Sequence, residues 1–204
     1  MVPALLPLSI LEAIQNIDTP QDDGLGALED ELASKRLGLS ATVAAQVERY
    51  REQAKSGGEV SDDEALAVFR LVGRRPDAAL VYADAGRRSA RYAAKRLATG
   101  SRAMITAAPG RAATALALRA SARLGRRWLQ ADLHVSEGTI RCEMADSLGF
   151  RARDDGTGCH FYTAAIAELL RQVGDLEWTV LHELCQGRGD HRCLWRAMRA
   201  EGYE

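Results

Sequence analysis

The chain has 204 residues, of which 47% are hydrophobic and 27% charged, and its formal net charge is −1 at pH 7. These values are ordinary for a soluble globular protein with one sizeable core and room for a small appendage. No apolar run approaches the roughly 18 residues that a transmembrane helix needs, so we expect no membrane span.

The chain opens with an apolar stretch, Met1 to Ile17, that has no basic start, contains Glu12 and lacks a small-residue cleavage site. We therefore expect an N-terminal helix docked on the body of the protein rather than a signal peptide. The chain shows no secretion signal. With that, the spacing of its cysteines favours metal-bound thiolates in a reducing compartment over disulfides. The expected location is the cytoplasm.

Helix signals dominate the first 127 residues. Apolar side chains recur at helical spacing, and Ser61 with Glu64 forms a capping box at the start of one helix. The expected helices cover residues 9–17, 19–35, 40–54, 61–72 and 77–97, followed by one that ends near residue 127. The Arg-Arg-Pro break at 74–76 divides the chain into an N-terminal helical segment, 1–75, and a second domain, 76–204.

The periodicity changes from helix to strand at Trp128. Apolar residues alternate with polar ones up to Val135, and they alternate again from Ile140 to Met144, which predicts a hairpin that turns at Glu137-Gly138. A helix over 158–173 and strands from Trp178 and from Cys193 follow. The predicted fold class is α+β, with N-terminal helices followed by an antiparallel sheet that contains an inserted helix.

The small net charge hides a strong asymmetry along the chain. Residues 1–64 carry 13 acidic and 5 basic side chains, whereas residues 70–127 carry 14 basic and only two acidic ones. The basic stretch is either a surface for nucleic acid, a membrane face or carboxylated ligands, or a helix face that the acidic segment covers. We favour the covered face, and because few aromatic residues lie between the arginines, nucleic acid is disfavoured.

Three of the four cysteines and one histidine have the spacing of a metal site: Cys159, His182, Cys185 and Cys193. Seven residues with two glycines and an aspartate separate the last two cysteines, which predicts a hairpin with a thiol at each end. Thiolate and imidazole are ligands that Zn²⁺ prefers, and four of them form a closed structural site. Unrelated buried cysteines are the alternative interpretation, and Glu183 is the competing fourth ligand.

Strand geometry adds a condition to this site. Side chains alternate along a strand, so regular pairing would place His182 and Cys185 on opposite faces of the sheet. The strand must therefore bulge or end near Leu184 if both are to bind one ion. With that condition, zinc would pin the C-terminal hairpin to the helix that begins near Cys159.

The same residues resemble the 4-vinyl reductase domain, found in bacteriochlorophyll-biosynthesis proteins and in sensor modules of phenol-responsive activators. That family has a cysteine that opens a helix, an acidic residue three before a second cysteine, a Gly-Asp turn, and a third cysteine eight residues later. Cys159, Cys185 and Cys193 match, and His182 stands where the family usually has glutamate. In the sensor members these positions bind zinc, and histidine is an equally good zinc ligand.

The resemblance is strongest to the bacteriochlorophyll branch and covers about residues 76–199. It extends to Asp84-Ala85-Gly86, Tyr92, Lys95-Arg96-Leu97, Ala108-Pro109 and Trp128. The branch usually has a Gly-Ser-Gly-type stretch after its tryptophan, where this chain has Leu129 to Asp132. That departure weakens the inference that both bind the same ligand.

The resemblance implies a pocket between helices and sheet for an aromatic or tetrapyrrole ligand. The candidate lining residues are Tyr92, Met104, Trp128, Met144 and Phe161. Plain core packing is the favoured alternative for each of them. The expected partners are a hydrophobic small molecule, with a magnesium tetrapyrrole as the leading example, and a protein of pigment biosynthesis, and a homodimer is left open.

The chain shows no motif that would carry catalysis alone. Gly24-Leu25-Gly26 and Gly187-Arg188-Gly189 lack the strand-turn-helix context of a dinucleotide loop, and no P-loop or nucleophile elbow is present. We therefore expect a zinc-stabilised carrier for a chlorophyll-precursor ligand rather than an enzyme. The alternatives are a 4-vinyl reductase component that needs an external donor, and a ligand-sensing regulatory module.

Overall fold

The computed structural model describes residues 1–19, 40–136, 139–175 and 177–199. The helix expected over 19–35 and the turn expected at 137–138 lie essentially outside these residues. The first part of the chain forms helices and one short strand pair: β1 (Val2–Pro3), α1 (Leu5–Asp18), α3 (Ala41–Lys55), β2 (Glu59–Val60), α4 (Asp62–Gly73), α5 (Ala78–Lys95), α6 (Thr99–Ala107) and α7 (Gly110–Leu124). The second part combines strands with helices: β3 (Leu133–Ser136), β4 (Thr139–Met144), α8 (Leu148–Ala152), α9 (His160–Gly174), β5 (Trp178–Leu184) and β6 (Cys193–Arg199).

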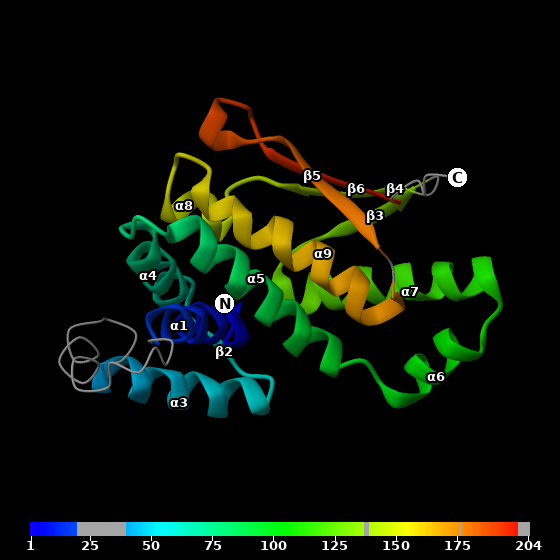
Figure 1. Ribbon diagram of the computed structural model, residues 1–204, viewed down its shortest axis with the longest axis horizontal. Helices are drawn as coiled ribbons and strands as arrows, with labels where there is room; N and C mark the ends of the chain where they lie inside the picture. Colours follow the sequence, from blue (N-terminus) through cyan, green and yellow to red (C-terminus); the bar gives the residue numbers. More distant parts are fainter. Residues whose placement is uncertain (20–39, 137–138, 176, 200–204) are drawn as a thin grey trace, which may run out of the picture.

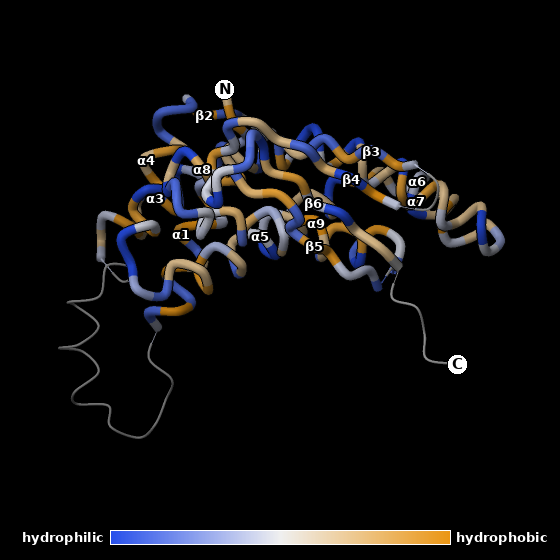
Figure 2. Tube along the Cα trace, turned by 90° about the horizontal axis from the view of Figure 1, so that it is seen from above, coloured by the Kyte–Doolittle hydropathy of each residue, from blue (hydrophilic) through white to orange (hydrophobic). Residues whose placement is uncertain are grey.

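The predicted α+β fold class is confirmed. The four-stranded sheet is antiparallel in the order β3-β4-β6-β5, and α9 is inserted between β4 and β5. The sheet lies along α9, α5 packs on α9, and α1 packs between α5 and α3 (Figure 1). In both views α6 and the start of α7 form the end of the molecule away from α3 (Figures 1 and 2).

Two helix starts follow directly from their serines. The Ser40 side chain accepts a hydrogen bond from the Val43 N–H, and the Ser61 side chain accepts one from the Glu64 N–H. Each serine satisfies one of the backbone donors that a helix leaves unpaired at its start. The predicted starts of α3 and α4 are therefore confirmed.

The chain does not turn from helix to strand at Trp128. Residues 125–129 continue α7 as a π-helical turn, Gln130 then adopts φ of +53°, and β3 begins at Leu133. Trp128 and Leu129 are consecutive and both buried, so they cannot alternate between faces as strand residues do. The expectation of a strand directly from Trp128 was wrong for this reason.

The N-terminal segment shares its core with the rest of the chain. One continuous cluster of buried apolar side chains includes residues from Val2 to Ala197. The proposed division after residue 75 stays a prediction. Within the N-terminal segment, the Arg75 guanidinium donates two hydrogen bonds to the Asp18 carboxylate, at 2.7 and 3.0 Å.

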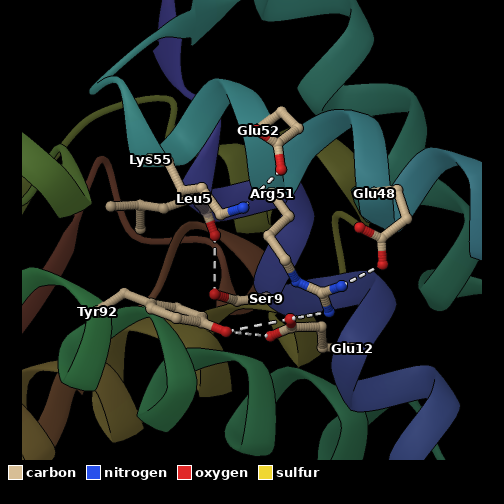
Figure 3. A network of polar contacts seen from close by, with 8 residues as sticks. All are labelled: Leu5, Ser9, Glu12, Glu48, Arg51, Glu52, Lys55 and Tyr92. Atoms are coloured by element: carbon tan, nitrogen blue, oxygen red, sulfur yellow. Dashed lines mark hydrogen bonds and ion pairs between the residues drawn. The ribbon is translucent and has the colours of Figure 1, made fainter.

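A buried carboxylate also joins the two segments (Figure 3). Glu12 of α1 is 9% exposed and accepts hydrogen bonds from the Tyr92 hydroxyl at 2.8 Å and from Arg51 at 3.0 Å. A buried carboxylate is costly unless donors satisfy it, so these contacts fix α1 against α3 and α5.

Within the residues described, no helix combines the length and hydrophobicity that crossing a bilayer requires.

Candidate metal centre

The structure brings the four predicted metal ligands together. The ligand atoms of Cys159, His182, Cys185 and Cys193 all lie within 4.8 Å of one another. Cys159 immediately precedes α9, His182 lies in β5, Cys185 follows β5, and Cys193 begins β6. This Cys3His group could hold a metal ion, and it would join the start of α9 to the turn between β5 and β6.

A bulge in β5 meets the condition that strand geometry imposed. His182 pairs with Trp195, but the register then shifts between His182 and Leu184, so Leu184 pairs with Leu194. A bulge inserts one extra residue and changes the face to which the following side chains point. The shift allows the His182 and Cys185 side chains to reach the same cluster.

The turn after β5 is held by its own hydrogen bonds. The Asp190 carboxylate accepts a bond from the Cys185 N–H at 2.7 Å, and the Cys185 carbonyl accepts bonds from the Arg188 and Asp190 N–H groups. The Gln186 N–H points to the Cys193 sulfur at 3.5 Å. A donor of this kind stabilises negative charge on the sulfur, as a metal-bound thiolate requires.

The His182 ring is oriented by aromatic stacking. It lies parallel to the Trp195 ring, with 4.5 Å between centroids and 5° between planes. Its Nε2 is buried and has no hydrogen-bond partner among the described residues. A buried imidazole nitrogen in this position is satisfied when it binds a metal ion.

Glu183, the competing ligand, lies elsewhere. Its carboxylate forms an ion pair with Arg196 at 3.0 Å. The metal-ligand group contains His182 and does not contain Glu183. The geometry therefore favours His182 as the fourth ligand.

The spacing of the sulfurs suits a tetrahedral ion. The Cys159 and Cys193 sulfurs are 3.7 Å apart, and zinc–sulfur bonds of about 2.3 Å give a tetrahedron with edges of about 3.8 Å. The hydrogen bond between these thiols lowers the pKa of Cys193 and raises the pKa of Cys159. One thiol of the pair is thus poised to ionise before the other.

Two glycines allow the metal-binding loops to approach each other, and the sequence did not single them out. A Cβ on Gly156, which has φ of +81°, would lie 2.7 Å from the Cys185 sulfur. A Cβ on Gly187 would lie 2.3 Å from the Gly156 nitrogen. Both distances are too short for a side chain. The Gly-Thr-Gly before Cys159 was the only local signal of this packing.

A hollow of about 330 Å³ adjoins the cluster on the protein surface. Its lining includes His182 and Cys185 together with Asp155, His160 and Arg188. Metal ligands therefore line a hollow that solvent reaches. Small chelators and exchanging ions have a route to the site.

The five predicted ligand-binding residues occupy different surroundings. Tyr92 donates its hydroxyl hydrogen bond to Glu12, and Trp128 lies beneath the guanidinium groups of Arg96 and Arg127, at 4.8 and 5.2 Å. Met104 is 59% exposed and lines a hollow between α6 and α7 that the other four do not line.

The remaining two predicted residues are core side chains. Phe161 is fully buried, with its ring centroid 5.2 Å from that of Phe69 and 5.1 Å from that of Tyr162. Met144 is 9% exposed and pairs with Cys193 across the sheet. Their part in ligand binding stays a prediction.

Comparison of the chain with models of known families and with curated proteins found no match to either.

Proposed function

We propose that the four donors bind one Zn²⁺ ion as a structural centre. The observation behind this proposal is that three thiols and one imidazole from separate elements have their ligand atoms within 4.8 Å of one another. This donor set is typical of structural zinc sites, and four protein ligands leave no position for an activated water. The ion would stabilise the β5–β6 turn against α9 and would supply no hydrolytic chemistry.

We further propose that this pinned domain carries a hydrophobic ligand, with a chlorophyll-precursor tetrapyrrole as the leading candidate. The support is the resemblance at the three cysteines, Cys159, Cys185 and Cys193, together with a fold in which helices pack against one antiparallel sheet. A carrier needs a stable scaffold and an apolar surface rather than a reacting centre. The lack of a nucleotide or flavin motif in the sequence favours this role over that of a self-sufficient reductase.

Metal analysis with a matched cysteine control tests the zinc centre. We expect one zinc per chain in the wild type and in Cys142→Ser, because Cys142 is buried outside the cluster. Cys193→Ser removes a ligand and should lose the metal. Equal zinc content in Cys193→Ser and Cys142→Ser, or no zinc in the wild type, would refute the proposal.

A second pair of variants tests the unusual ligand. His182→Glu places a carboxylate, another zinc ligand, at this position and should retain most of the metal, whereas His182→Ala should release it. Glu183→Gln should keep the metal, because Glu183 pairs with Arg196. Loss of zinc in Glu183→Gln with retention in His182→Ala would reverse the assignment.

Absorbance tests the carrier role. The zinc-loaded protein, mixed with protoporphyrin IX and passed through a desalting column, should retain the porphyrin with a shifted Soret-type band. Complete separation of porphyrin from protein would remove this role. Loss of a vinyl group from a chlorophyllide with NADPH and the purified chain alone would instead identify a reductase.

A further inference from the structure

A second hollow lies at the α6–α7 end of the molecule, away from the metal cluster. It has a volume of about 310 Å³, is open to solvent, and lies between the end of α5, α6 and α7. Leu97, Met104, Ile105, Leu116 and Leu124 form much of its wall. This is the lower end of the size range of small-molecule sites, so a larger molecule would be only partly enclosed.

Three arginines accompany these apolar walls: Arg96, Arg119 and Arg123. Among the described residues that line the hollow, none is acidic. In the sequence, none occurs between Asp84 and Asp132, although this stretch contains 11 lysines and arginines. The charge around the hollow is therefore of one sign.

Arg119 and Arg123 differ from the third arginine. Arg96 donates a hydrogen bond to the Ala54 carbonyl and lies over the Trp128 ring. Arg119 and Arg123 are exposed, one turn apart on α7, and neither has a carboxylate partner in the described ranges. Like charges at this spacing repel each other, so an anion bound between them would be stabilised.

On the apolar side of the hollow Met104 is exposed, whereas Leu97, Ile105 and Leu116 are half-buried and Leu124 is buried. None of the residues of α6 is buried, and Met104 is the third most exposed large hydrophobic side chain described. An exposed apolar wall beside free guanidinium groups matches a molecule with an apolar body and an acidic group. Packing explains this wall only in part, because Ile105 is partly buried against the core whereas Met104 remains 59% exposed.

We propose that this hollow binds an apolar organic carboxylate, with the body of the ligand on Met104, Ile105 and Leu116 and its carboxylate on Arg119 and Arg123. Guanidinium groups bind carboxylates with two parallel hydrogen bonds, which fixes the orientation of the ligand. The inference rests on the proposed role as a carrier of a hydrophobic ligand and adds the site and the charge of that ligand. A tetrapyrrole with propionate groups belongs to this class.

The test compares two probes on the full, zinc-loaded chain. Protoporphyrin IX has two free propionates, and its dimethyl ester has the same ring with both carboxylates blocked. Titrations followed by porphyrin absorbance should show the free acid binding at least tenfold more tightly than the ester, because charge-assisted bonds are lost in the ester.

Variants locate the binding site. Arg119→Gln/Arg123→Gln should weaken binding of the free acid at least tenfold and leave binding of the ester unchanged, whereas Arg119→Lys/Arg123→Lys should keep much of the affinity. Arg111→Gln is the matched control, because Arg111 lies on the same helix but lines only a neighbouring hollow, which it shares with Arg119 and not with Arg123. All these side chains are exposed, and zinc content with circular dichroism would verify folding.

Each other outcome overturns the inference in a distinct way. If Arg119→Gln/Arg123→Gln binds protoporphyrin IX as tightly as the wild type, the carrier role stands but this site is wrong. If the wild type binds neither porphyrin, both proposals fail. If the wild type instead sediments with phosphatidylglycerol vesicles and the double glutamine variant does not, the arginines serve a membrane surface.

Discussion

The α5–α9 helix pair and the metal-binding end of the sheet are held together in opposite ways. The buried residues of α5 are mostly small, including Ala85, Gly86 and Ala90, and Gly86 lies against the α9 backbone at Phe161. The turn between β5 and β6 contains mainly polar residues, several of them exposed. The helix pair is stabilised by apolar burial, whereas the turn is held by its own hydrogen bonds and, in our proposal, by a metal on its four donors.

This difference indicates where the proposed metal would contribute most to stability. Burial of apolar surface stabilises a region in proportion to the area removed from water, and the residues between Cys185 and Cys193 bury little such area. A metal bond replaces packing at such a place. The helical core should therefore persist without metal, while the β5–β6 end should not.

Removal of the metal should have the largest effect. A ligand that binds only the folded state at a free concentration a thousandfold above its Kd stabilises it by about 4 kcal/mol. Treatment with a chelator should lower the thermal midpoint strongly but retain most of the helical circular dichroism. An unchanged thermal midpoint with and without chelator would contradict the prediction that the β5–β6 end needs a metal to stay folded.

The reactivity of the cysteine thiols tests the same prediction at the metal site itself. Without metal, Cys159, Cys185 and Cys193 should react with a thiol reagent much faster than in the loaded protein. Cys142 is the internal control: it is 1% exposed, and burial raises its pKa to about 12, so it should stay unreactive in both forms. Equal reactivity of all four cysteines after chelation would indicate global unfolding instead.

The helix pair should be most sensitive at its closest contact. A Cβ on Gly86 would lie 2.1 Å from the Phe161 carbonyl oxygen of α9, and backbone cannot move aside cheaply. Gly86→Ala should therefore lower the free energy of unfolding by about 3 kcal/mol, measured by denaturant titration, although alanine is the better helix former.

Gly100 in α6 is the matched control for this substitution. A Cβ on Gly100 would meet no described atom within 4 Å beyond its chain neighbours and the backbone of its own helix, so Gly100→Ala should be neutral or stabilising by up to about 1 kcal/mol. If both variants lower the free energy of unfolding by the same amount, the close contact at Gly86 is not what stabilises the α5–α9 pair. Zinc content should be unchanged in Gly100→Ala.

Local chemistry explains which features could be predicted from the sequence. The serine caps of α3 and α4 and the alternation from Ile140 to Met144 depend on neighbours in the chain, and the metal ligands were found from their residue types and spacing; the structure bears out the caps and the alternation and brings the four ligand atoms together. The bulge in β5 followed from a geometric condition on two ligands. These features needed no knowledge of distant contacts.

The features that could not be predicted from the sequence depend on contacts between residues far apart in the chain. The π-helical turn through Trp128 buries two adjacent side chains, a pattern that does not fit the alternation of a half-buried strand. The stacking of His182 on Trp195 and the approach of Gly187 to Gly156 join residues brought together by pairing of strands and loops. Periodicity carries no information about such contacts.

A buried carboxylate in the helix pair gives the smallest effect and the one with a pH signature. Glu168 of α9 is 6% exposed, and burial opposes its ionisation. Hydrogen bonds from Arg171, Arg91 and Gln172 outweigh that cost and lower its pKa from 4.5 to about 2. Because the folded-state pKa is the lower one, the stabilisation is complete above about pH 4.5 and is lost as the pH falls towards 2.

Glu168→Gln should therefore cost about 1 kcal/mol at pH 7, since Arg91 and Arg171 are about half exposed and solvent screens the pair. The difference from the wild type should shrink between pH 4.5 and 2. Comparing the two proteins at each pH cancels any loss of metal in acid, because both would lose it. Asp132→Asn, which removes an exposed pair with Arg126, should change stability by less than about 0.5 kcal/mol. A difference for Glu168→Gln that stays constant across this range would mean that its ionisation does not hold α5 to α9, leaving the apolar contact around Gly86 as the main link between the two helices.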